Sequence, residues 1–131
     1  MALVPTLTID DATTFSDAIN FSVTDSLTTA APAQALSLVN ATNAGAASIV
    51  IPASTAIAYL FARHTGFAAD GTTANLHLVD VEFTTNEAIA RLGAGEFLFM
   101  PIFHAGEDVG VQFQVASSSV VKMEYAYWTK G

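Results

Sequence analysis

The sequence predicts an all-β domain, an antiparallel β-sandwich of jelly-roll-like form with eight or nine short strands. Apolar residues recur at every second position in short runs, which is the period of a half-buried strand. Segments rich in Gly, Asn, Asp and Ser separate these runs, and no segment has the periodicity of a long helix. The 131 residues suit a single domain, 1–131, because two domains would each be too small to bury a sizeable core.

The first expected strand has features of an arm as well as of a sheet. Leu3, Leu7 and Ile9 share one face, whereas Pro5 lacks an N–H group and suits an edge strand or an arm. A polar, turn-like segment follows. Residues 1–11 are therefore a candidate extended N-terminal arm.

Eight further strands are expected along the rest of the chain. A turn at Asp70-Gly71 precedes the strand at 76–83, whose alternation changes phase and so predicts a β-bulge or burial on both faces. The strand at 96–103 is apolar at almost every position and is placed in the centre of the sandwich. The expected strands are residues 3–9, 19–24, 35–39, 48–51, 56–64, 76–83, 96–103, 109–116 and 120–128.

One short segment favours a helix. Thr84 and Glu87 have the spacing of a capping box, so residues 84–92 could begin as a capped helical turn. Gly93 and Gly95 would end it after at most two turns.

The charge balance argues against several partners. The chain has four basic and twelve acidic residues, which gives a formal net charge of −8. The basic residues are scattered singly, so neither nucleic acid nor an anionic membrane surface is an expected partner. The N-terminal residues lack the pattern of a secretory signal, and the chain has no cysteine for a disulfide or a thiolate metal site. Only 12% of residues are charged, about half the usual ~25%, which favours a surface that is buried against copies or partners.

No segment carries the pattern of a catalytic or metal site. His64, His77 and His104 are far apart, and on a regular strand His77 would face away from Asp80 and Glu82. The chain also lacks a Gly-x-Ser-x-Gly nucleophile elbow, and its adjacent acidic residues suit solvated turns. We therefore expect no catalytic residue, no cofactor, no bound metal and no enzyme activity.

Aromatic residues near the C-terminus admit two interpretations. Tyr125 and Tyr127 share a face, so with Trp128 they could form a sugar-stacking platform. Packing between the sheets or at a subunit contact is the favoured interpretation, because aromatic rings dominate both environments. The candidate interface residues are Leu3, Val4, Leu7, Tyr125, Tyr127 and Trp128.

Two segments resemble a known class of protein. Residues 91–101, RLGAGEFLFMP, resemble a passage with leucine, Gly-x-Gly-Glu-Phe, apolar residues and proline. Residues 111–125, VQFQVASSSVVKMEY, resemble a hairpin whose second strand ends in Glu-Tyr. Together they are similar to small β-sandwich structural proteins of tailed bacteriophage virions, of the head decoration or cement type. The resemblance covers roughly residues 86–128, and it implies structural positions rather than catalytic ones.

The expected function is that of a phage virion structural protein. Within that class we favour a capsid decoration protein on the outside of the head shell, made in the host cytoplasm, with a tail or fibre subunit as the alternative. Its expected partners are copies of itself and the major capsid protein or another virion protein. A carbohydrate-binding module is the alternative from another class, followed by a small cupin-like enzyme.

Overall fold

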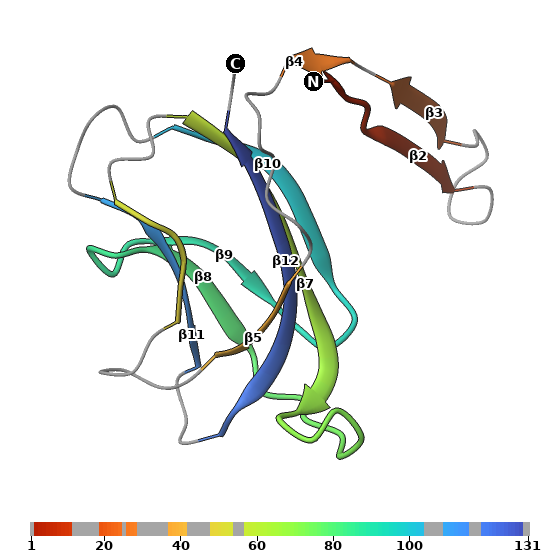
Figure 1. Ribbon diagram of the computed structural model, residues 1–131. Coiled ribbons are helices and arrows are strands. Elements are labelled where there is room, and N and C mark those ends of the chain that lie inside the picture. Colours follow the sequence, from red (N-terminus) through yellow and green to blue (C-terminus); the bar gives the residue numbers. More distant parts are fainter. Residues whose placement is uncertain are drawn as a thin grey trace.

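The computed structural model describes residues 2–11, 19–24, 26–28, 37–41, 48–53, 57–103, 109–115 and 119–129. Every regular element in these ranges is a β-strand, and all strand pairs are antiparallel, so the predicted all-β, sandwich-like fold is confirmed (Figure 1). The strands are β1 (Ala2–Leu3), β2 (Thr6–Asp11), β3 (Ile19–Thr24), β4 (Leu27–Thr28), β5 (Ser37–Ala41), β6 (Ser48–Ile51), β7 (Ile57–Ala68), β8 (Val79–Phe83), β9 (Ala88–Leu92), β10 (Phe97–Phe103), β11 (Val111–Val115) and β12 (Val121–Thr129).

Eight of these strands form two four-stranded sheets. One sheet has the order β10-β7-β12-β5 and the other the order β6-β11-β8-β9. In chain order, the first of these eight strands pairs with the last, the second with the second to last, and so on. The pairs are β5 with β12, β6 with β11, β7 with β10 and β8 with β9. Successive pairs therefore alternate between the two sheets.

The core lies between the two sheets and is built from alternate side chains of each strand. Leu60 on β7, Met123 on β12 and Phe113 on β11 are fully buried members of this core. Phe113 meets Tyr125 of the opposite sheet edge to face, with ring centroids 5.9 Å apart. This contact ties the two layers together.

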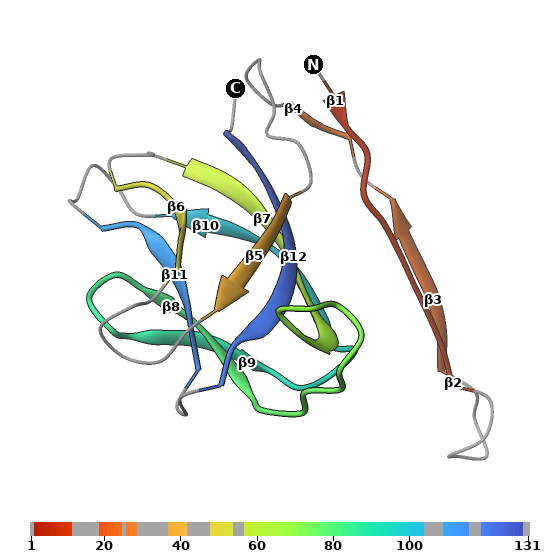
Figure 2. The same ribbon diagram turned by 60° about the horizontal axis from the view of Figure 1, so that its bottom comes forward.

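The first four strands form a separate two-stranded ribbon, called here the N-terminal ribbon. β2 pairs with β3, and β1 pairs with β4. The ribbon stands beside the β10-β7-β12-β5 sheet rather than joining it (Figures 1 and 2). The predicted strand at 3–9 is therefore present, interrupted at Val4 and Pro5, and its only strand partners among the described residues are β3 and β4.

The predicted helical turn at residues 84–92 is wrong. Residues 84–87 form the turn of the β8–β9 hairpin, in which Asn86 adopts a φ of 67°. Strand β9 follows, and Arg91 on it lies opposite Asp80. The Thr84 hydroxyl accepts a hydrogen bond from the backbone N–H of Gly110, at 3.0 Å, instead of capping a helix. Pairing with distant strands overrides the local capping pattern here.

The expected placement of residues 96–103 in the centre of the sandwich holds for only one face of the strand. Leu98, Met100 and Ile102 contact the core, but β10 is an edge strand whose only partner among the described strands is β7. Pro101 on β10 fits this position, because proline within a sheet is confined to edges and bulges. The strand is apolar on both faces because its outward side chains face the N-terminal ribbon.

Two local predictions around residues 70–83 have different outcomes. The turn at Asp70-Gly71 is present, with a φ of 74° at Gly71. The next strand begins only at Val79, so residues 76–78 lie outside it. The predicted phase change between Leu78 and Val79 is therefore the start of the strand and not a bulge within it. The β8–β9 register shifts elsewhere, between Val81 and Glu82, and both of these side chains are buried.

Candidate functional site

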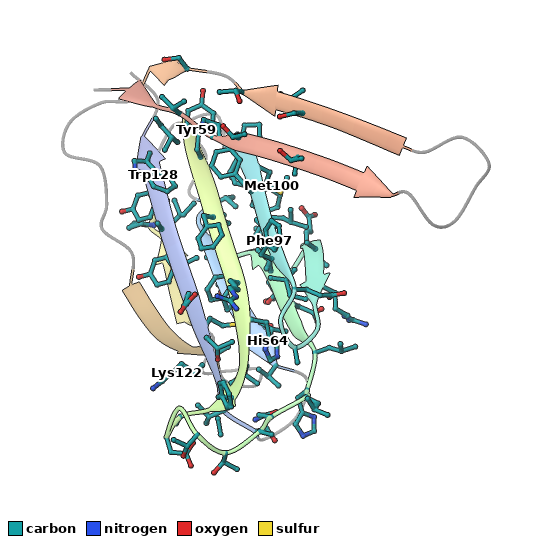
Figure 3. All side chains as sticks on the ribbon, turned by 90° about the vertical axis from the view of Figure 1, so that its right-hand side faces the viewer. Tyr59, His64, Phe97, Met100, Lys122 and Trp128 are labelled. Atoms are coloured by element: carbon teal, nitrogen blue, oxygen red, sulfur yellow. The ribbon has the colours of Figure 1, made fainter. Side chains whose placement is uncertain are left out.

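The outer face of the β10-β7-β12-β5 sheet carries a continuous group of aromatic side chains, called here the aromatic face. Cross-strand pairing places Phe99 opposite Phe61 and Trp128 opposite Tyr59. The Tyr59 and Phe99 rings are stacked, with centroids 6.3 Å apart, and Phe99 and Trp128 lie 6.5 Å apart in a tilted arrangement. The aromatic face consists of Tyr59, Phe61, Phe97, Phe99 and Trp128 (Figure 3).

Strand alternation accounts for this face. On β10, Leu98, Met100 and Ile102 point inwards and contact the core, which leaves Phe97 and Phe99 on the outside. Phe97 is 61% exposed and Phe99 is 36% exposed. Tyr59 is buried although it does not belong to the core cluster, so its ring is covered from the outside.

The N-terminal ribbon is amphipathic. On one of its faces Thr6 and Thr24 share a hydrogen bond of 2.9 Å, and Thr8 and Ser22 share one of 3.3 Å. The register of β2 and β3 places Leu7 opposite Val23, on the other face. Leu7, Ile9 and Val23 are all exposed apolar side chains.

A groove of about 350 Å³ lies between the N-terminal ribbon and the aromatic face, and it is called here the ribbon groove. Figure 3 shows β2 crossing the sheet near Tyr59 and running on past β10. None of the described residues that line the groove is charged. Its lining residues are Pro5, Thr6, Leu7, Phe61, Phe97, Leu98 and Phe99.

Charged groups lie further along the same sheet. Arg63 and Glu124 form a loose ion pair, with 3.6 Å between nitrogen and oxygen. They line a second, open depression of about 330 Å³ together with Lys122 and Phe67. The outer face is thus divided into an apolar half beside the ribbon and a polar half at the other end.

The candidate interface residues fall into two groups. Leu7 lines the ribbon groove, Trp128 belongs to the aromatic face, and Val4 is exposed on the ribbon. Tyr125 and Tyr127 instead face inwards and pack against the core. Leu3, the last of the six candidate interface residues, is half-buried.

Sequence reasoning missed the residues that dominate the aromatic face. Phe97 and Phe99 were missed because their strand was expected to lie in the centre of the sandwich. The signal that could have found them is Pro101, because a proline in this apolar run marks an exposed edge.

His64 is fully buried and has a structural environment. Its Nδ1 accepts a hydrogen bond from the backbone N–H of Gly66 at 2.9 Å, so the ring hydrogen is on Nε2. Nε2 donates to the backbone carbonyl of His77, also at 2.9 Å. Both ring nitrogens are therefore engaged, and the His77 side chain is exposed.

The described residues contain no group of three or more His, Asp or Glu side chains that could hold a metal ion. His104, Ser117, Ser118, Glu107 and Asp108 lie outside the residues that the structure describes. Asp80 and Glu82 have other partners: Arg91 donates to Asp80 at 2.5 Å, and Gln112 donates to Glu82 at 2.7 Å.

The clearest electrostatic perturbation is in the turn after β7. The hydroxyl of Thr73 and the backbone N–H groups of Thr72 and Thr73 all donate to the Asp70 carboxylate. These hydrogen bonds lower the pKa of Asp70 from 3.8 to about 2. Asp70 is exposed, and it stabilises this turn.

Comparison with known proteins adds no relative: no family model, curated protein or solved structure matches the chain. Over the described ranges, no helix is long and apolar enough to cross a membrane. The aromatic face and the ribbon groove are thus the strongest candidate for a functional site.

Proposed function

We propose that the chain is a non-enzymatic structural protein of a phage virion, and specifically a capsid decoration protein that binds the outside of the head shell. The observation that carries the proposal is an amphipathic ribbon, uncharged from Ala2 to Ile9, that projects from a β-sandwich beside an exposed aromatic face. Such surfaces suit repeated contacts with other subunits, because interface cores favour aromatic side chains over Lys, Glu and Asp.

The strand order supports the same proposal. We infer that the sandwich is a jelly roll, because its strand pairs are nested from the outside inwards and alternate between the two sheets. Jelly rolls are common in viral capsid proteins, in lectins and in cupins. Since a fold does not determine a function, the proposal depends on the ribbon and the aromatic face.

The deciding experiment locates the protein in the virion. Mass spectrometry of purified particles of the phage that encodes the chain should detect it, and gold-labelled antibodies should mark the head. Labelling of the tail would instead favour the alternative of a tail or fibre subunit. Absence from the particles would refute both.

A carbohydrate-binding module is the second candidate, and the polar depression favours it. Phe67 is an exposed ring beside Arg63, Lys122 and Glu124, and an aromatic platform with charged hydrogen-bonding groups suits a sugar. A glycan array tests this candidate. Specific binding that is lost in Phe67→Ala would favour it over the virion role.

A further inference from the structure

We propose that the ribbon groove is a contact between copies of this chain, in which the N-terminal ribbon of one copy packs against the aromatic face of its neighbour. The inference deepens the proposed function by naming the surface through which the copies associate. It is nevertheless tested on the free protein, without a shell.

The ribbon leaves its own apolar face incompletely covered. Leu7 is 47% exposed and Val23 is 58% exposed, although these two residues face each other across the strand pair. The ribbon crosses only one end of the sheet and then runs past its edge strand, β10 (Figure 3). Beyond that edge, no described part of the same chain lies against it in Figures 1–3.

The opposite wall of the groove, formed by the aromatic face, is also incompletely covered. Phe97 is the most exposed aromatic residue of the face, yet it lies on a strand whose other side is anchored in the core. Exposed apolar side chains that gather on two facing walls mark an interaction site rather than ordinary surface. A second ribbon would bury both walls at once.

Charge favours a second copy as the occupant. The chain has a net charge of −8, so copies repel each other through most of their surface. The groove lining and the ribbon from Ala2 to Ile9 contain no charged residue, and the acidic residues of β2 are its last two. Two copies can therefore meet here without bringing like charges together.

The first test is sedimentation equilibrium of the full chain. We expect wild type to associate at micromolar concentration, and Phe97→Asp and Val23→Asp to raise the dissociation constant by roughly 10- to 100-fold, because each places a charge in an apolar contact. Leu76→Asp is the matched control, since Leu76 is 74% exposed but lies outside the groove, and it should leave association unchanged. Thermal melts check that all variants fold.

The second test uses the absence of cysteine from the chain. Leu7→Cys and Phe97→Cys are made in separate chains, mixed and oxidised, and a disulfide between the two chains is expected. Leu7→Cys mixed with Leu76→Cys is the control and should not cross-link. Linked peptides identified by mass spectrometry show which residues are joined.

Three results would overturn the inference. The first is a wild-type chain that stays monomeric at 100 µM concentration, whether or not it binds phage heads. The second is association that neither aspartate variant weakens. The third is a Leu7→Cys/Phe97→Cys double variant that links only within one chain while the mixed single variants do not link. Failure of the virion role is distinguishable, because it leaves self-association of the pure protein intact.

Discussion

Replacing His64 by leucine tests how the buried end of β7 is held together. Leucine keeps a side chain of similar size but removes both ring nitrogens. The backbone N–H of Gly66 then loses its acceptor, and the carbonyl of His77 loses its donor. The substitution therefore leaves two backbone polar groups without partners while the cavity stays filled.

The magnitude follows from these two groups. An unsatisfied buried polar group costs about 1–3 kcal/mol. Because both hydrogen bonds are only partly buried, the lower part of this range applies to each. We expect His64→Leu to lower the free energy of unfolding by about 2–4 kcal/mol.

Urea unfolding followed by the fluorescence of Trp128 measures this change. The control is His77→Ala, whose side chain is exposed and whose carbonyl remains in place, and it should change stability by less than about 0.5 kcal/mol. Hydrogen exchange should locate the effect, with faster exchange at Gly66 and at Asn75, whose N–H donates to the Gly66 carbonyl. A stability loss below about 1 kcal/mol in His64→Leu would refute the assigned role of the imidazole.

Three further predictions concern other parts of the chain. Deleting Met1–Ile9 should weaken oligomerisation or shell binding more than it lowers the melting temperature, because β2 pairs with none of the described strands of the sandwich; a collapsed fold with intact binding would contradict this. Gly110→Ala should cost about 1–3 kcal/mol in urea unfolding, because the new Cβ would lie 2.2 Å from the Ile51 carbonyl oxygen; unchanged stability would contradict it. The lowered pKa of Asp70 gives wild type stability that is fully present above pH 3.8 and is lost as the pH falls through about 2. Asp70→Asn should remove this stability, so the urea midpoints of the variant and of wild type should converge with acidification. A difference between the two midpoints that is constant with pH would contradict this.

Strand periodicity was sufficient to predict the fold class. The alternation at Val111, Phe113 and Val115 gave both the strand and its buried face, because a period of two is a local property. The capping-box pattern at Thr84 and Glu87 wrongly predicted a helix, because the structure there depends on pairing between strands and not on a local pattern. A capping box describes one turn of chain, whereas the ion pair of Asp80 and Arg91 forms only when β8 and β9 pair.

The candidate site was harder to predict than the fold. Leu7 and Trp128 were candidate interface residues, but the ribbon groove brings Leu7 together with Phe61 and Phe97, which are distant in sequence. No local pattern shows that the ribbon crosses this sheet. The low number of charged residues predicts that part of the apolar surface is buried against other chains.

The hydroxyl groups that pair across the ribbon bear on the salt concentration and temperature at which the ribbon can make contacts. Thr6, Thr8, Ser22 and Thr24 satisfy one another across the strands, so this face can meet water or a neighbour without any charge. A contact made through the opposite, apolar face has no ion pair for dissolved ions to screen. Raising the ionic strength would not weaken such a contact, and it would lessen the repulsion between the negatively charged copies. The contact would weaken on cooling, because the burial of apolar surface is driven by entropy near room temperature.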